Sequence, residues 1–378
     1  MKIINIIGAR PQFMKYFPIA RAIEINNGIR DVLVHTGQHY DYTMSKIFFD
    51  ELGIKEPDYH LEVGSGTHGM QTTQCVQRIE KVLNDVEPDI VVVYGDTNST
   101  LAGAIAASKL HIPVIHIEAG LRSFNKNMPE ELNRILSDHV SSMLFCPSTT
   151  AIKNLVKEGF TNIVNDGKLV TIGEVNNISL PETININDPV VINSGDVMHD
   201  TLLYSREMAR TKSDILSTLG IRSRKYTVLT LHRAENTDDT IRMDALIDFI
   251  NTSVNGETVI FPMHPRTKKI YGDVTKPLAK NVKIIDPVGY FDLVALLSNA
   301  RLLMTDSGGM QKEAYWLGVP CITLRDETEW TETVDAGWNI LYKDYRGEHK
   351  PAAERTDLYG DGRAAEVIVG CLMRVLGM

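Results

Sequence analysis

The chain has 378 residues, which is too long for one ordinary hydrophobic core and long enough for two domains. Its 43% hydrophobic and 23% charged residues are typical of a globular protein, and its net charge of −9 argues against non-specific binding to nucleic acid. An anionic ligand would therefore need a locally basic site, and no apolar run reaches the roughly 18 residues of a membrane-spanning helix.

Short apolar runs rich in β-branched residues alternate with longer segments that have the spacing of helices. Runs that are apolar on both faces are typical of parallel strands covered by helices on both sides. We expect five strands in the first half and five in the second, at Ile3–Ile7, Val32–His35, Ile90–Tyr94, Val114–Ile117, Met143–Cys146, Tyr226–Leu231, Thr258–Met263, Val282–Ile285, Leu302–Thr305 and Cys321–Leu324. This order predicts the α/β class, with two doubly wound, Rossmann-like domains.

Two segments stand outside this alternation. Residues 165–192 are rich in Asn, Thr, Ile and Val and contain Gly and Pro, so we interpret them as a β-type insertion or hairpin at the domain junction. The stretch Gly362–Leu376 has the pattern of a helix. We place the domain boundary at 193/194.

The cysteines indicate a reducing compartment. The four of them are far apart in the sequence and lie mostly in apolar runs, as core residues do: Cys75, Cys146, Cys321 and Cys371. We therefore expect neither a disulfide framework nor a metal site. Because the chain also begins directly with a strand pattern, we expect no signal peptide and a cytoplasmic protein.

The turn after the first expected strand is unusual for a nucleotide-binding unit. The segment NIIGARPQFMK (5–15) passes from a strand through Gly8 into a helix, but it has Arg10 and Lys15 where a dinucleotide site has glycines. The spacing G-x-G-x-x-G occurs instead at 64–69, after the partly polar run YHLEV and without an acidic residue at a strand end about 20 residues later. We interpret 64–69 as a loop near a ligand cleft.

Charged side chains gather where the expected strands end, and ligands of doubly wound sheets bind beyond the carboxyl ends of strands. These residues are Arg10, His35, Asp96, Glu118 and Ser148 in the first half and His232, Arg233, His264, Arg266, Asp286, Asp306 and Arg325 in the second. Two sheets that face each other would bring both sets into one cleft. The simpler alternative, that polar residues accumulate where strands meet solvent, fits any single position but not the whole set.

The segment DSGGMQKEA (306–314) predicts a phosphate-binding helix start. Ser307, Gly308 and Gly309 precede a helix that we expect to begin near Met310. Free N–H groups and the positive end of a helix attract a phosphate, and glycines let it approach the backbone. Glu313 then lies about one turn into the helix, where it could accept hydrogen bonds from ribose hydroxyls. The alternative is an ordinary N-capped turn.

The segment NMPEELNR (127–134) predicts another helix start, since Pro129 suits the first turn of a helix. Glu130 and Arg134 are four residues apart and hence on one face, where they can form an ion pair. Beside a ligand cleft, Glu130 could instead take part in acid–base chemistry.

As an ordered set, these motifs resemble one enzyme family. The segments GARPQFMK, HTGQHYD, VYGDTNSTLAG, HIEAGLRS, MPEELNR, LHRAEN and TDSGGMQKEA are similar to those of the non-hydrolysing UDP-N-acetylglucosamine 2-epimerases, and the resemblance covers the chain except 165–192. It implies the GT-B fold, with two Rossmann-like domains and the active site in the cleft between them. It also implies that the C-terminal helix, within 362–378, returns to the first domain, so that the second domain is 194–361.

The resemblance implies roles for particular residues. Asp96, Glu118, Glu130 and His232 match the catalytic positions of the family. Ser307, Gly308, Gly309 and Glu313 match its UDP pocket, and Arg10 and Lys15 match its basic turn facing the diphosphate. We expect Arg122, Arg233, His264 and Arg325 to bind substrate as well, and Lys126 is a further candidate cation.

The reaction of the family implies elimination and re-addition. The C2 proton of an N-acetylhexosamine has no adjacent carbonyl group to make it acidic, so inversion without a redox cofactor needs another route. A carboxylate removes this proton as UDP departs, which leaves a 2-acetamidoglucal, and UDP adds back after protonation of the opposite face. We therefore expect no cofactor and no metal. The expected partners are the UDP-sugar and a second copy of the chain in a homodimer, without nucleic acid or membrane.

We expect interconversion of UDP-N-acetylglucosamine and UDP-N-acetylmannosamine, which supplies cell-surface polysaccharide precursors. The variant segments GARPQF and GDVMHD (195–200) look like a branch that includes 2-epimerases of UDP-2,3-diacetamido-2,3-dideoxy-glucuronate, whose C6 carboxylate would need an additional cation. A GT-B glycosyltransferase would have a similar fold and UDP pocket but a less acidic cleft. A non-catalytic UDP-sugar sensor would not need Asp96, Glu118 and Glu130 together.

Overall fold

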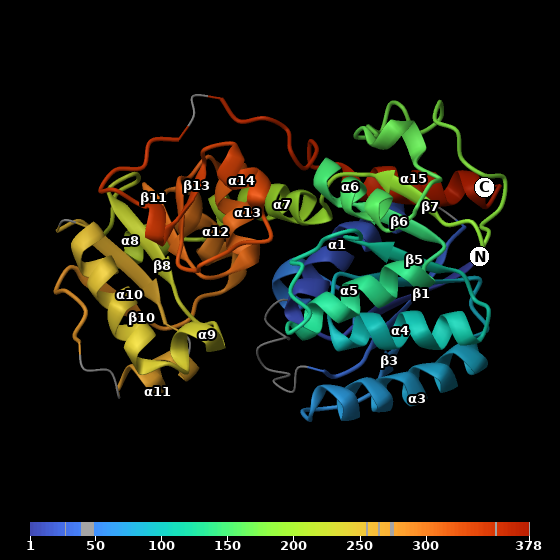
Figure 1. Cartoon of the computed structure of the whole chain (residues 1–378), viewed down its shortest axis with the longest axis horizontal. Helices are drawn as coiled ribbons and strands as arrows, with labels where there is room; N and C mark the ends of the chain where they lie inside the picture. Colours follow the sequence, from blue (N-terminus) through green and yellow to red (C-terminus); the bar gives the residue numbers. More distant parts are fainter. Residues whose placement is uncertain are drawn as a thin grey trace. The chain divides into compact units, whose positions relative to one another are not determined.

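The chain divides into two compact units. The computed structural model describes residues 1–26, 28–38, 49–254, 256–263, 265–272, 276–351 and 354–377. The first unit is made of Met1–Leu203 and Asp357–Met378, and the second is made of Tyr204–Thr356. In Figure 1 the first unit is the blue-to-green part together with the red C-terminal helix. The boundaries expected from the sequence, 193/194 and 361/362, lie near these divisions.

A parallel sheet forms the centre of the first unit. Within the described residues it has seven strands, in the order β3-β2-β1-β4-β5-β6-β7. They are β1 (Lys2–Ile7), β2 (Arg30–His35), β3 (Tyr59–His60), β4 (Ile90–Tyr94), β5 (Val114–Ile117), β6 (Met143–Cys146) and β7 (Val190–Asn193). The five strands predicted here are confirmed. The two-residue edge strand β3 and the strand β7 were not predicted.

Helices cover this sheet. On one face, α3 (His68–Val86) and α4 (Asn98–Lys109) pack side by side and bury a cluster that includes Cys75 and Ile79 against β1, β2 and β4. The helix α5 (Pro129–Val140) packs against α4, and α6 (Thr149–Lys157) follows β6. The helix α1 (Arg10–Ile25) follows β1 and packs against α15 (Ala364–Val375). Figure 1 shows α3 and α4 along one side of the strands.

The predicted β-type insertion or hairpin at 165–192 is wrong. The chain there has a short 3-10 helix, η1 (Val164–Gly167), then turns, and forms a strand only at its end, in β7. Val190, Val191 and Ile192 are buried and pair in parallel with β6, so this apolar run is a seventh strand of the main sheet. The polar residues before it are mostly exposed. They therefore do not form strands with one face buried against the protein, as a packed hairpin would.

The C-terminal helix α15 belongs to the first unit and begins on a buried carboxylate. Asp200, on α7 (Val197–Lys212), accepts hydrogen bonds from the N–H groups of Ala364 at 3.2 Å and Ala365 at 2.9 Å. Burial raises the pKa of Asp200 to about 7, although these two hydrogen bonds act to lower it; the nearby Asp196 raises it further.

We expect Asp200 to make the free energy of unfolding fall as the pH rises from about 4 to about 7. An ordinary aspartate titrates at about 3.9, so in this window the unfolded chain has lost a proton that the folded chain still holds. The Asp200→Asn variant has no such proton to lose. Urea unfolding between about pH 4 and pH 8 should therefore show the variant gaining stability relative to the wild type as the pH rises, and a difference that does not change with pH would contradict the raised pKa.

Gly195 lies against the segment that leads back into the first unit. It has a φ of +78°, and the next N–H group, that of Asp196, donates to the carbonyl oxygen of Tyr359 at 2.9 Å. A Cβ on Gly195 would lie 2.7 Å from that same oxygen. The backbone there has no space for a side chain.

We expect Gly195→Ala to lower the free energy of unfolding by about 2–4 kcal/mol, through the left-handed backbone and the contact with Tyr359 together. Gly159→Ala is the matched control, because Gly159 has a φ of +97° but nothing within 4 Å of an added Cβ. It should cost only the conformational penalty of about 1–2 kcal/mol. Guanidinium unfolding measures both, and equal losses would show that the contact with Tyr359 does not matter.

A second parallel sheet forms the centre of the second unit. Within the described residues it has six strands, in the order β10-β9-β8-β11-β12-β13. They are β8 (Tyr226–Thr230), β9 (Thr258–Pro262), β10 (Val282–Ile285), β11 (Leu302–Thr305), β12 (Cys321–Thr323) and β13 (Asn339–Leu341). The five strands predicted here are confirmed, and the edge strand β13 was not predicted.

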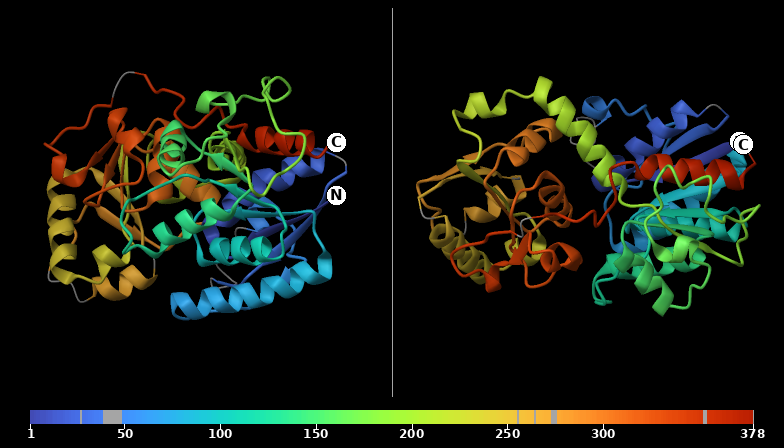
Figure 2. Two further views of the ribbon diagram at one scale, coloured as in Figure 1. Left: turned by 45° about the vertical axis from the view of Figure 1, so that its right-hand side comes forward. Right: turned by 90° about the horizontal axis from the view of Figure 1, so that it is seen from above.

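The second sheet is buried on both faces, which is why its strands read as continuous apolar runs. Consecutive residues of β8, Val228 and Leu229, belong to two separate core clusters. Figure 2 shows helices on both sides of this sheet. The helices of the unit are α8 (Ile215–Leu219), α9 (Ala234–Thr237), α10 (Thr240–Ser253), α11 (Pro265–Tyr271), α12 (Tyr290–Ser298), α13 (Gly308–Leu317) and α14 (Thr331–Asp335).

The cysteines behave as predicted. All four are free and buried, and burial raises the pKa of each thiol. Of the helices in the described part of the chain, none is both long and apolar enough to cross a membrane.

Candidate active site

Two neighbouring strands of the first sheet end in turns that carry predicted catalytic carboxylates. The strand β4 runs into Gly95 and Asp96, and β5 runs into Glu118. Because β4 and β5 pair in parallel, both turns lie at the carboxyl edge of the sheet. The expectation that Asp96 and Glu118 each follow the end of a strand is therefore confirmed, and the structure adds that the two strands are neighbours.

Lys15 pairs with Glu118 within the first unit. Its ammonium group forms an ion pair with Glu118 Oε2, and the two side chains are only 6% and 7% exposed. Gly95, with a φ of +62°, makes room for this pair, since a Cβ there would lie 2.8 Å from Lys15 Nζ. Glu118 itself has a φ of +69°, a strained conformation that costs about 1–2 kcal/mol and is often found at functional sites.

Asp96 is held by Arg134, which comes from α5. The Nε and Nη2 groups of Arg134 donate to Asp96 Oδ2 at 3.0 and 2.7 Å, and Nη1 donates to Glu131 Oε2 at 2.9 Å. The sequence had singled out Glu130 as the partner of Arg134. The structure gives the ion pair to Glu131, which is buried, whereas Glu130 is exposed at the start of α5.

Glu131 faces inward because it fixes the loop before α5. Its carboxylate accepts hydrogen bonds from the N–H groups of Ser123 at 2.8 Å and Phe124 at 2.9 Å. Burial acts to raise the pKa of Glu131, but these hydrogen bonds and the charge of Arg134 bring it below its ordinary value. Glu131 is therefore an ionised structural group that holds Arg134 in place.

A buried pair that the sequence did not reveal links the two catalytic turns. His116, within β5, donates from Nε2 to the carbonyl oxygen of Gly95 at 2.7 Å, and its Nδ1 lies 2.7 Å from Asp138 Oδ1. Asp138 accepts the N–H of Gly120 on its other oxygen at 3.1 Å. Both His116 and Asp138 are fully buried. These contacts therefore connect Gly95, which precedes Asp96, with Gly120, which follows Glu118 by two residues.

The two imidazole nitrogens of His116 face two hydrogen-bond acceptors, the carbonyl oxygen of Gly95 and the carboxylate of Asp138. Burial acts to raise the pKa of Asp138, but the charges and hydrogen bonds of His116 and Arg122 bring it below its ordinary value. Asp138 is therefore ionised, with His116 and Arg122 as its partners.

Arg122, a predicted substrate-binding cation, has acidic partners within the first unit. It is buried, its Nε and Nη2 donate to the two oxygens of Glu158 at 2.7 Å, and Nη1 lies 2.7 Å from Asp138 Oδ2. Although burial opposes its charge, Glu158 and Asp138 raise the pKa of Arg122. Its charge is compensated within the first unit, as that of Lys15 is by Glu118.

The backbone N–H groups of the turn at the start of α1 already have a side-chain partner within the protein. Gln12 Oε1 accepts the N–H groups of Gly8 at 2.8 Å and Ala9 at 3.1 Å, which a phosphate would otherwise contact. Arg10 is exposed at the first position of the helix and Lys15 is buried one turn later. Of the predicted loop 64–69, residues 64–67 lead from the edge strand β3 to α3, which Thr67 caps, and residues 68 and 69 are the first of the helix. Neither turn forms a dinucleotide fingerprint.

In the second unit, the ends of β8 and β11 are joined by Asp306. This fully buried carboxylate follows β11 and accepts the N–H groups of His232 and Arg233, both at 2.9 Å. His232 Nδ1 lies 3.3 Å from Asp306 Oδ1, and 48% of the His232 side chain is exposed. Asp306 thus fixes the turn that presents His232 and Arg233, which sequence reasoning had placed at this strand end.

The helix α13 begins at Gly308, two residues before the predicted start near Met310. Its first residues are Gly308 and Gly309, and Ser307 precedes them without making a side-chain cap. Glu313 is buried one turn later and accepts the hydroxyl of Tyr290 at 2.8 Å. The first N–H groups of a helix have no intrahelical partner, so the Ser307–Gly309 turn can bind an anion.

The predicted cations of the second unit lie near acidic residues. Arg325, after β12, is buried and forms ion pairs with Glu329 at 2.8 Å and Glu235 at 3.1 Å. Arg233 Nη2 lies 3.9 Å from Glu329 Oε1. His264 lies outside the described residues.

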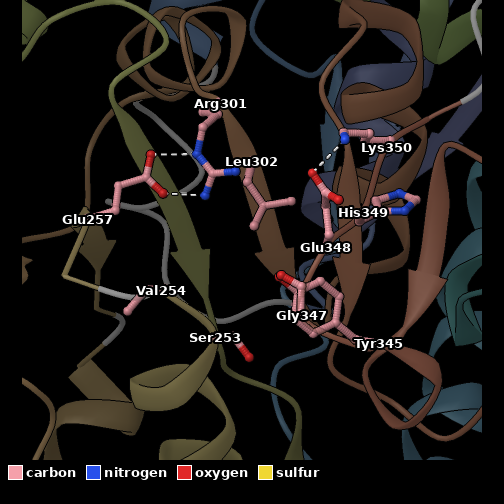
Figure 3. A pocket seen from close by; sticks show the side chains of 10 residues that line it. All are labelled: Ser253, Val254, Glu257, Arg301, Leu302, Tyr345, Gly347, Glu348, His349 and Lys350. Carbon is pink, nitrogen blue, oxygen red and sulfur yellow. Dashed lines mark hydrogen bonds and ion pairs between the residues drawn. The ribbon is translucent and has the colours of Figure 1, made fainter.

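A cavity of about 520 Å³ lies elsewhere in the second unit (Figure 3). Glu257 and Arg301, which line it, directly precede β9 and β11, so the cavity is at the amino edge of the sheet. Arg301 Nε donates to Glu257 at 2.6 Å, and Lys350 pairs with Glu348 at 2.8 Å, as the dashed lines show. The cavity is thus distinct from the strand ends that carry the predicted ligand-binding residues.

Comparison with known proteins decides between the alternatives left by the sequence. Residues 21–373 match the family model described as UDP-N-acetylglucosamine 2-epimerase. The chain belongs to this family. The predicted class of enzyme, a UDP-sugar 2-epimerase and hence an isomerase, is confirmed.

Individual members of the 2-epimerase family are similar over their whole length. The chain is 44% identical to the UDP-2,3-diacetamido-2,3-dideoxy-D-glucuronate 2-epimerase of Pseudomonas aeruginosa, over 99% of this chain and 100% of that one. It is 42% identical to the UDP-N-acetylglucosamine 2-epimerase of Methanocaldococcus jannaschii, over 98% and 99%. A crystal structure of the Methanocaldococcus jannaschii enzyme in complex with UDP-GlcNAc and UDP gives a TM-score of 0.81 at 40% identity, over 99% of both chains. The predicted GT-B-like class, with two parallel α/β domains, is confirmed.

Proposed function

We propose that this epimerase interconverts UDP-N-acetylglucosamine and UDP-N-acetylmannosamine. The observation that carries the proposal is the pair of adjacent strand-end turns that present Asp96 and the strained Glu118 beside Lys15. The Ser307–Gly309 turn supplies the helix start that a departing diphosphate needs. The relative of known structure that binds UDP-GlcNAc and UDP supports the same ligand.

The proposed reaction has an elimination and an addition. A carboxylate of the first unit takes the C2 proton, the C2–H electrons form a C1=C2 double bond, and the C1–O bond breaks toward UDP. In the second half, an acid delivers a proton to the other face of C2 while the diphosphate oxygen re-forms the bond to C1. Two faces need two proton-transfer groups, for which Asp96, Glu118 and Glu130 are the candidates.

The leaving diphosphate needs positive charge and N–H donors that are already in position. We assign this role to the N–H groups of the Ser307–Gly309 turn, to His232, and to Arg10 and Lys15 from the first unit. Glu313 is assigned to the ribose hydroxyls. Arg233, Arg325 and His264 complete the proposed substrate-binding set.

Deuterium oxide tests the reaction. The protein is incubated with UDP-N-acetylglucosamine in D₂O, and the H2 signal of the sugar is followed by NMR. We expect this signal to disappear as the product forms, since the proton returned to C2 comes from an acid that exchanges with solvent. Epimerised product that retains its original hydrogen would reject the mechanism, and transfer of the sugar to an acceptor would favour a GT-B glycosyltransferase.

A second candidate substrate is UDP-2,3-diacetamido-2,3-dideoxy-glucuronate, because the relative from Pseudomonas aeruginosa, 44% identical, carries that name. Its C6 carboxylate would need a cation, for which Arg122, Lys126, Arg233 and Arg325 are the candidates. The same NMR experiment with both substrates compares kcat/KM directly. A preference for the uronate would replace the first assignment.

We further propose that the protein acts as a homodimer in the cytoplasm and supplies precursors of cell-surface polysaccharides. Light scattering after size-exclusion chromatography measures the assembly, for which twice the chain mass of 42.2 kDa is expected. A monomer at micromolar concentration would contradict this part of the proposal.

A further inference from the structure

A carboxylate of the protein already lies at the start of α13. If Gly308 carried a Cβ, the nearest atom to it would be Glu329 Oε1, and Trp330 Nε1 would be 3.2 Å away. Glu329 therefore lies against the backbone of the first helical residue. A negative side chain is favoured there for the same reason as a phosphate, namely the positive end of the helix.

The same carboxylate is surrounded by the cations that we assign to substrate. Arg325 Nη1 lies 2.8 Å from Glu329 Oε2, Arg233 Nη2 lies 3.9 Å from Oε1, and only 13% of the Glu329 side chain is exposed. Burial acts to raise the pKa of Glu329, but Arg325 and Arg233 bring it below its ordinary value. Glu329 is thus ionised at neutral pH and has the environment of a bound phosphate.

The segment that carries Glu329 is fixed to α13 by neighbouring contacts. The hydroxyl of Thr328 donates to Gln311 Oε1 at 2.6 Å, and the ring of Trp330 lies 3.8 Å from Lys312 Nζ. Gln311 and Lys312 both belong to α13 and are buried. The contacts of Thr328 and Trp330, the residues on either side of Glu329, therefore fix the position of its carboxylate.

We propose that Glu329 is a resident anion that competes with the diphosphate for the Ser307–Gly309 turn and so limits the affinity for UDP. This inference depends on the proposed function, since it takes that turn as the diphosphate site. Two anions cannot share one helix start and one pair of guanidinium groups without strong repulsion. Binding of UDP must displace Glu329 or accept its repulsion, which weakens UDP binding and speeds its release.

The test compares UDP with uridine by isothermal titration calorimetry on the full-length protein. In Glu329→Gln the side-chain shape stays and the charge goes, so we expect UDP to bind about tenfold more tightly at low salt. Uridine, which has no phosphate, should bind as it does to the wild type. Because the gain comes from charge, it should shrink as salt is added.

Two further variants make the result specific. Glu235→Gln removes the other partner of Arg325, but Glu235 is 49% exposed and contacts Nε, whereas Glu329 contacts Nη1, so UDP affinity should change less than about threefold. Glu329→Asp keeps the charge but shortens the side chain, so it should give a smaller gain than Gln and serves if Gln does not fold. UDP binding to folded Glu329→Gln that is equal to or weaker than wild type would overturn the proposal. No UDP binding to the wild type would instead reject the proposed function.

Discussion

Replacing Glu118 by Gln should lower kcat for C2 epimerisation by about a hundredfold or more, with the fold intact. Glutamine keeps the shape of the side chain but cannot accept a proton, and loss of a general acid or base typically costs about 10²–10⁴-fold. The variant also leaves Lys15 without its charged partner in a buried site. Initial rates and the loss of the H2 signal in D₂O measure the effect, and thermal melting confirms folding.

The matched control for this prediction is Glu257→Gln. Glu257 also forms an ion pair, with Arg301, but at the amino edge of the second sheet and away from every predicted site residue. We expect its kcat to stay within about twofold of the wild type, since exposed pairs contribute little. A Glu118→Gln enzyme as fast as the control would remove Glu118 from the proton-transfer steps.

The second large effect is expected at His116. His116→Ala removes the hydrogen bond to Asp138 at 2.7 Å and leaves a cavity in a fully buried site, while Arg122 remains as the charged partner of Asp138, so we expect a loss of about 2–4 kcal/mol of unfolding free energy. It also releases the carbonyl of Gly95, so the turn that carries Asp96 is no longer tied to the turn that carries Glu118. We therefore expect kcat to fall about tenfold or more in the protein that remains folded.

Urea unfolding and initial rates measure the two effects separately. His139→Gln is the control, because His139 is the next residue after Asp138 on α5 but is 46% exposed, with its Nε2 at 3.3 Å from Glu158. It should change the unfolding free energy by less than about 0.5 kcal/mol. A His116→Ala protein as stable and as active as His139→Gln would show that the link between the two turns has no effect.

The sequence was sufficient for the strands that are buried on both faces. β4, β5 and β6 were predicted at the residues that the structure gives, because each is a continuous apolar run between polar turns. β7 was missed although Val190–Ile192 is equally apolar, because the polar stretch before it suggested a different kind of segment. β3 has only two residues and pairs at an edge, so it leaves almost no periodic signal.

The side chains at strand ends could be predicted, but their partners could not. Consecutive helical residues point about 100° apart, so the sequence alone could not decide whether Glu130 or Glu131 faces Arg134. Glu131 faces inward because its carboxylate accepts hydrogen bonds from the N–H groups of Ser123 and Phe124, and this contact is not visible in the local sequence. His116 and Asp138 are 22 residues apart, and Glu329 reaches Gly308 only through the tertiary fold. No local spacing reveals either arrangement.

The central claim is that carboxylates of one unit and the anion-binding turn of the other act on a single ligand. A crystal structure of the Asp96→Asn variant with UDP-N-acetylglucosamine tests it most directly. The account predicts a diphosphate against the N–H groups of Ser307–Gly309 and sugar C2 within reach of Glu118 and position 96. A diphosphate bound at that turn with the sugar remote from both side chains would contradict it.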